Sequence, residues 1–152
     1  MLVLCMLEAL AAPAHAGQPE AVLTAVNAAR ARAGCPALVM NGRLVAAAKG
    51  HATAMAVQNF FGHAGTDGSR FSGRIKAQGY SYRVAAENIA AGQSSAGAVV
   101  ESWLNSGGHR RNILNCQLRD TGIAVVYQPD DKPLRGSRYP LRYYWVQVFA
   151  AP

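Results

Sequence analysis

Charged and aromatic residues are scarce in this sequence, and several motifs that would identify a function at once are missing. Asp, Glu, Lys and Arg supply only 15% of the residues, and Phe, Trp and Tyr only 8%. The basic residues are scattered and are not interleaved with stacking aromatics, so we expect no nucleic-acid ligand. Beyond the first sixteen residues, no apolar run approaches the roughly 20 residues that span a bilayer, so no transmembrane segment is predicted. The metalloprotease string HExxH and the nucleophile string GxSxG are also absent, so neither motif indicates an enzyme class.

Apolar residues, in contrast, are abundant enough to build a folded core. They make up 51% of the 152 residues, a composition typical of a globular protein rather than a disordered one. No break in composition is long enough to be a linker, and no internal repeat is visible, so a single domain is predicted over residues 17–152. The formal net charge of +7 and the pI near 9.8 suit attraction to anionic polymers of the cell envelope or to lipid surfaces.

The first sixteen residues, MLVLCMLEALAAPAHA, have the character of a signal peptide. They are apolar, and they end in Ala14-His15-Ala16, which fits the small-residue rule for signal peptidase. We therefore expect residues 1–16 to be removed and the protein to be secreted or periplasmic, although a core helix is the alternative. Loss of Glu8 would raise the formal charge from +7 to +8, because one negative charge leaves.

The cysteines suggest one disulfide bond in the exported chain. Removal of residues 1–16 takes away Cys5, so two of the three cysteines remain, Cys35 and Cys116. In an oxidising compartment they would close a loop of about 80 residues, a link worth roughly 4 kcal/mol in chain entropy. Two buried free thiols are the alternative.

Hydrophobic periodicity predicts helices first and strands last. Helices are expected over residues 19–33, 41–58, 69–78, 95–106 and 109–115, with Asn41 capping the second and Asp67 the third. A short strand is expected over residues 84–91, and residues 121–127 and 141–149 should form a β-hairpin. Trp103, Phe60 and Phe61 are expected in the core. This order, without βαβ alternation, indicates an α+β domain whose antiparallel sheet is covered by helices.

Three strings place polar or ionisable residues in apolar surroundings: NFFGHAGTDG at 59–68, AENIAAG at 86–92 and SWLNSGGHRRNIL at 102–114. A fourth, YYWVQVFA at 143–150, follows them near the end of the chain. Together and in this order they resemble the bacterial branch of the CAP (or SCP) superfamily, which comprises cysteine-rich secretory proteins, antigens and pathogenesis-related proteins. The resemblance extends over about residues 20–151.

The resemblance implies a three-layer α-β-α sandwich with a small central antiparallel sheet. It also implies a cleft into which His63, Glu87 and His109 project. Four more residues of the strings are expected to border or support this cleft: Asn88, Ser106, Tyr144 and Gln147. The eukaryotic branch carries a second Glu and a second His where this chain has Ser106 and Tyr144, so only His63 and Glu87 match that branch in place.

Two imidazoles and one carboxylate are a ligand set that a divalent metal such as zinc could use. The spacings of 24 residues between His63 and Glu87 and of 22 between Glu87 and His109 have no diagnostic value. A hydrogen-bonded triad without metal is therefore an equal alternative at this stage.

For function, the resemblance favours a binding module over an enzyme. Members of the superfamily are extracellular and are linked to binding of lipids or protein partners, so the expected ligand is a lipid, a cell-envelope component or a protein. A metal-dependent or Ser/His-type hydrolase, with Ser102, Ser106 or Tyr144 as the hydroxyl, is the first alternative. A structural protein of the envelope is the second.

Overall fold

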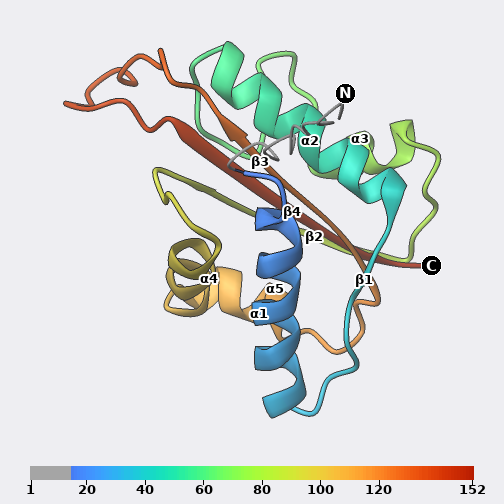
Figure 1. Cartoon of the computed structure of the whole chain (residues 1–152). Helices are drawn as coiled ribbons and strands as arrows, with labels where there is room; N and C mark the ends of the chain where they lie inside the picture. The colour runs from blue at the N-terminus through green and yellow to red at the C-terminus, as the bar shows by residue number, and fades with distance from the viewer. Residues whose placement is uncertain (1–14) are drawn as a thin grey trace, which may run out of the picture.

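The centre of the molecule is a four-stranded sheet with the strand order β1-β3-β4-β2. The computed structural model describes residues 15–152 (Figure 1). The strands are β1 (Val39–Met40), β2 (Val84–Ala91), β3 (Asp120–Tyr127) and β4 (Tyr143–Ala151). The helices are α1 (Gln18–Arg32), α2 (Gly42–Val57), α3 (Phe71–Ala77), α4 (Ala96–Leu104) and α5 (Gly107–Ile113).

Helices cover both faces of the sheet, so the predicted α-β-α sandwich is confirmed. Alternate residues of β4 point to opposite faces, as the two-residue period of a strand requires. Val146 and Val148 pack in a cluster with Leu44 and Met55 of α2. Trp145 and Phe149 pack in the other cluster, which takes in α1, α4 and α5. In Figure 1, α2 and α3 lie on one side of the sheet and α1, α4 and α5 on the other.

The predicted helices and strands occur, and two of the helices, α2 and α4, begin at a side-chain cap. Asn41 accepts hydrogen bonds from the amides of Arg43 and Leu44 and so begins α2 as expected. Ser95 does the same for α4 by accepting from the amide of Ala98. β3 and β4 pair antiparallel, which confirms the hairpin.

Three details differ from the sequence-based expectations. The strand β1 was not predicted; it is two residues long and pairs in parallel with β3, too short a segment for periodicity to reveal. The prediction that Asp67 caps the third helix is wrong, because its carboxylate accepts from the amide of Ser69 in the preceding turn and α3 begins only at Phe71. Phe61 is 44% exposed and is therefore not a core residue, whereas Trp103 is fully buried.

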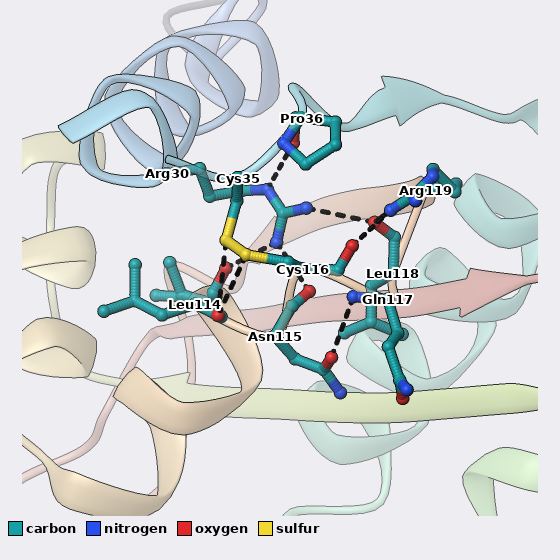
Figure 2. The surroundings of a disulfide bond; sticks show 10 residues. Arg30, Cys35, Pro36, Leu114, Asn115, Cys116, Gln117, Leu118 and Arg119 are labelled. Carbon is teal, nitrogen blue, oxygen red and sulfur yellow. Dashed lines mark hydrogen bonds between the residues drawn. A yellow bond between two sulfur atoms is a disulfide. The ribbon is translucent and has the colours of Figure 1, made fainter. Parts of the chain in front are cut away.

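A disulfide bond between Cys35 and Cys116 ties the end of α1 to the segment after α5, as Figure 2 shows. This pairing confirms the prediction. Beside it, the fully buried Arg30 donates hydrogen bonds to four backbone carbonyls. The four acceptors are Pro36, Ile113, Asn115 and Leu118, at 2.7 to 3.0 Å. The disulfide and Arg30 thus hold α1 against the chain that leaves α5.

Within residues 15–152, no helix combines the length and the apolar character that crossing a lipid bilayer requires. The first fourteen residues, which carry most of the predicted signal peptide, lie outside the described part of the chain.

Candidate functional site

A buried carboxylate joins two basic side chains where the segment between α2 and α3 meets β2. Glu87 lies on β2, and only 1% of its side chain is exposed. Its Oε1 lies 2.8 Å from Nδ1 of His63, and its Oε2 lies 2.9 Å from Nη2 of Arg74 on α3. Arg74 Nη2 also donates to the backbone carbonyl of His63 at 2.9 Å. We call His63, Arg74 and Glu87 the His63 cluster.

The hydrogen bond to Glu87 sets which nitrogen of His63 faces outward. A carboxylate can only accept, so Nδ1 of His63 must carry the proton in this contact. In the neutral ring, Nε2 then holds the free lone pair. The His63 side chain is 54% exposed, and it borders a cavity of about 300 Å³ together with Arg70 and Phe71. His63 can therefore accept a proton, or coordinate a cation, through Nε2.

His109 approaches the same stretch of β2 from α5. Asn88, which is fully buried, donates to the backbone carbonyl of His109 at 3.1 Å and accepts from Nδ2 of Asn112 at 2.8 Å. Burial lowers the pKa of His109, and the nearby charge of His63 lowers that pKa further. Nδ1 of His109 is buried and has no hydrogen-bond partner. His63 thus lies near enough to His109 to lower the pKa of His109.

The other residues named from the sequence do not join the His63 cluster. Tyr144 is fully buried, and its hydroxyl donates to Asp131 at 3.0 Å. Gln147 is also fully buried; it is the cross-strand neighbour of Asn88 and donates to Thr121 Oγ1 at 3.2 Å. Ser106 stands at the N-terminus of α5 without a side-chain capping bond. No serine or tyrosine hydroxyl is hydrogen-bonded to His63 or His109 in the part of the chain that the structure describes.

The fit of a metal ion to His63, Glu87 and His109 is poor as these side chains lie. Both oxygens of Glu87 are occupied, one by an imidazole and the other by a guanidinium that would repel a cation. Across residues 15–152, no group of three or more His, Cys, Asp or Glu side chains is placed to hold a metal ion. Glu87 instead orients His63, as an outer carboxylate does behind a metal-ligating imidazole. Zinc binding therefore stays a prediction, and it would have to use Nε2 of His63.

Sequence reasoning missed Arg74 and underestimated Asn112. Arg74 lies outside the four strings, on a short helix with no motif, so nothing in the sequence pointed to its contact with Glu87. Asn112 belongs to the third string, and it bridges α5 to β2 through the carbonyl of Glu87 and the side chain of Asn88.

A groove runs between α1 and α4 on the opposite side of the sheet from α2. Two adjoining cavities of about 490 and 420 Å³ form it, and both are lined by Arg32, Leu104 and Asn105. The first is lined further by Ala25, Ala28, Gly97, Val100 and Glu101, and the second by Ala29, Ala33, Arg110 and Leu114. The two ion pairs found within residues 15–152 both involve Glu87, so Arg32 and Arg110 have no carboxylate partner there. We call this feature the α1–α4 groove.

Comparison with known proteins places the fold and its strings in one family. The model of the cysteine-rich secretory protein family matches residues 23–149. The chain belongs to this family, the CAP family. It is 39% identical to the uncharacterized protein YkwD of Bacillus subtilis over 106 residues, which are 69% of this chain and 41% of that protein. This CAP domain therefore spans less than half the length of that relative.

Solved structures agree with this assignment. An extracellular protein of Bacillus anthracis that contains an SCP domain superposes with a TM-score of 0.75 at 26% identity, over 90% of this chain and 41% of that one. An outer surface protein of Borrelia burgdorferi superposes with a TM-score of 0.78 over 91% of this chain and 95% of that one. At 19% identity, the second likeness shows the fold alone.

Proposed function

We propose that this CAP domain is an extracytoplasmic binding module whose ligand is an anionic lipid with a single acyl chain, held in the α1–α4 groove. The observation that carries the proposal is the pairing of an apolar lining with basic side chains in one groove. Ala25, Ala28, Val100 and Leu104 offer small and aliphatic side chains, while Arg32 and Arg110 offer guanidinium groups without a carboxylate partner within residues 15–152. The cavities fall within the size range of about 300–1,000 Å³ that ligand sites usually have.

Charge and chemistry agree on this class of ligand. An acyl chain would remove apolar surface from water along α1 and α4, and each buried methylene contributes about 0.8 kcal/mol. A carboxylate or phosphate at the end of the chain would accept charge-assisted hydrogen bonds from the two arginines. Glu101 also lines the groove and would repel a second anionic group, so we expect one anionic group per ligand. The net charge of +7 would attract such ligands at a distance.

An exported location is part of the proposal. It is supported by the apolar character of residues 1–16, by the Cys35–Cys116 disulfide, which persists best in oxidising compartments, and by the likeness to an extracellular protein. Mass analysis of protein recovered from outside the cytoplasm should find a chain that begins at Gly17 and contains no free thiol. A mature chain that still carries residues 1–16 would contradict the signal peptide.

Displacement of a fluorescent fatty acid by saturated fatty acids of increasing length tests the lipid proposal. Affinity should rise with each added methylene until the groove is full. Arg110→Ala should weaken binding by about tenfold, as expected for a lost charge-assisted contact. Arg111→Ala is the matched control, because Arg111 is the next residue of α5 and does not line the groove.

A steric pair of variants tests the apolar part. A side chain added at Gly97 would meet no atom within 4 Å, so Gly97→Leu should fold and project into the groove, which Gly97 lines. Ala98→Leu, one residue further along α4 and outside the lining, is its control. Equal fatty-acid affinity in all four variants, or no binding by the wild-type protein, would reject lipid binding in this groove.

A reactive or metal-binding site at His63 is the second candidate function. It is supported by the contact between His63 Nδ1 and buried Glu87, which leaves Nε2 as a free base. A metal site would be supported if the protein binds zinc with micromolar affinity and if His63→Ala and His109→Ala abolish this binding without unfolding the protein. Zinc binding should weaken as the pH falls toward about 5, because a ligating imidazole must be neutral.

An enzyme would be supported instead if the protein hydrolyses an ester or peptide library and if Glu87→Gln abolishes this activity. If neither zinc binding nor turnover is detected, both hypotheses for this site fail.

A further inference from the structure

The connection between β3 and β4, residues 128–142, groups basic side chains that have no acidic partner. Four of the fifteen Lys and Arg residues of the chain lie in this stretch, and all four are exposed. They are Lys132, Arg135, Arg138 and Arg142. Both ion pairs within residues 15–152 involve Glu87, so none of these four side chains forms an ion pair in that part of the chain. We call residues 128–142 the β3–β4 loop.

One acidic side chain of the loop offsets this charge at the surface. Asp131 is buried, and its Oδ2 accepts hydrogen bonds from the backbone amide of Arg142 at 2.7 Å and from the hydroxyl of Tyr144 at 3.0 Å. Asp130 is exposed, so the exposed charges of the loop sum to +3, from four positive side chains and one negative. The loop therefore presents a positively charged surface.

Hydrogen bonds hold the β3–β4 loop in a defined shape. The amide of Gln128 donates to the carbonyl of Arg142 at 2.8 Å and so extends the pairing of β3 with β4. At the far end, the amide of Ser137 donates to the carbonyl of Leu134 at 2.8 Å and closes a turn in which Gly136 has a φ of 84°. In Figure 1 the loop projects beyond the end of the sheet, at the upper left. The basic side chains are thus carried on a preformed projection.

Tyr139 adds an exposed aromatic ring to this basic loop. It is 70% exposed, the highest value among the exposed large apolar side chains of residues 15–152. The guanidinium carbon of Arg138 lies 5.7 Å from the centroid of the Tyr139 ring. Tyrosine is enriched where a membrane meets water, because its ring is apolar and its hydroxyl is polar. A soluble anionic polymer would need only the cations, so the exposed ring favours a lipid surface as the partner.

We propose that the β3–β4 loop docks this domain on an anionic lipid surface. Lys132, Arg135 and Arg138 contact the lipid phosphates, and Tyr139 places its ring at the level of the headgroups. Each basic group close to such a surface raises the affinity roughly fivefold. The loop shares no residue with the lining of the α1–α4 groove, so docking does not depend on fatty-acid binding there.

Sedimentation with vesicles tests the docking. The protein should bind vesicles in which about a third of the lipid is phosphatidylglycerol, and it should not bind vesicles of pure phosphatidylcholine. Binding should weaken as salt is added, because salt screens the attraction between exposed charges and the surface.

Two double variants with the same change in net charge separate the loop from the general basicity of the protein. Lys132→Ala plus Arg135→Ala should weaken binding to the anionic vesicles by about 25-fold, because two groups leave the contact. Lys49→Ala plus Arg111→Ala is the control, since it also removes one Lys and one Arg, both exposed, from α2 and α5. It should weaken binding by less than about threefold, because charges beyond a Debye length are largely screened.

Substitution of Tyr139 reports on the aromatic contact. The two tryptophans of the chain, Trp103 and Trp145, are fully buried, so Tyr139→Trp introduces a single exposed indole. Its fluorescence should shift to shorter wavelength on anionic vesicles, and lipids brominated near the headgroup end of the acyl chain should quench it. Tyr139→Ala should weaken vesicle binding by about three- to tenfold, because the apolar ring no longer enters the interface.

Three results would overturn the proposal. Equal weakening by the two double variants would assign vesicle binding to net charge alone. Unchanged indole fluorescence on bound vesicles, together with equally tight binding of polyglutamate, would make the partner an anionic polymer rather than a lipid surface. The absence of sedimentation with anionic vesicles would exclude docking altogether, whatever the fatty-acid affinity of the α1–α4 groove.

Discussion

His51 is the buried residue whose ionisation most directly links this fold to pH. It lies on α2 with 2% of its surface exposed, and its Nε2 donates to the carbonyl of Gly62 at 2.8 Å. Burial lowers the pKa of His51 below its usual value near 6.5, and the positive charge of Arg74 lowers that pKa further. His51 thus helps to hold the start of the segment that carries His63, and it does so as a neutral ring.

The sign of the resulting pH dependence follows from linkage. Because the pKa of His51 is lower in the folded state, the unfolded chain binds more protons as the pH falls through about 6.5, and the free energy of unfolding decreases. The lowered pKa of His109 acts in the same direction. We expect urea denaturation to show lower stability at about pH 5.5 than at about pH 7.5.

The variant His51→Gln isolates the contribution of His51. Glutamine keeps an N–H donor for Gly62 but does not titrate, so the loss of stability between the two pH values should be smaller than in the wild-type protein. An unchanged loss would show that other groups, His109 first, cause the acid sensitivity.

At the scale of elements, the contact between α2 and β3 depends on the absence of one side chain. A Cβ added to Gly122 on β3 would lie 2.0 Å from the backbone carbon of Leu44 and 2.2 Å from the amide nitrogen of Val45. Both are backbone atoms at the start of α2, so no side-chain rotation can relieve the clash. Gly122 therefore lets α2 lie directly on the sheet.

We expect Gly122→Ala to destabilise the protein by about 3 kcal/mol or more, as overpacking against a rigid backbone does. Gly50→Ala is the control, since its Cβ would meet nothing within 4 Å in the middle of α2. That change should stabilise by up to about 1 kcal/mol through helix propensity. Thermal and urea unfolding of both variants measure the difference, and similar stabilities would contradict the assigned role of Gly122.

For the whole molecule, the disulfide closes most of the chain into one loop. Cys35 and Cys116 are 81 residues apart, and the loop contains β1, α2, α3, β2, α4 and α5. Replacing both cysteines by serine should lower the free energy of unfolding by about 4 kcal/mol, because the unfolded chain regains loop entropy. Arg30 should keep the native contacts, so near-UV circular dichroism of the folded variant should stay close to that of the wild-type protein. A loss below about 1 kcal/mol would contradict the entropic account.

The predictability of the site differed between residues for physical reasons. Asn41 was predictable as the start of a helix because capping is local chemistry. The four strings indicated His63, Glu87 and His109 through resemblance, since no spacing rule links residues more than twenty apart. Tyr144 and Gln147 follow strand alternation into opposite buried faces, so their place in a shared string did not bring them to the His63 cluster.

The sequence alone determined most of the helices and strands, the α+β class, the family and the pair of cysteines. Apolar periodicity and capping involve residues close together in the sequence, and the order of the four strings can be seen in the sequence directly. Only the tertiary structure decided that Arg74 binds the second carboxylate oxygen of Glu87 and that Arg30 donates hydrogen bonds to four backbone carbonyls. The physical reason is the same in each case. These contacts join residues distant in sequence, and they depend on which faces of helices and strands meet when the sandwich closes.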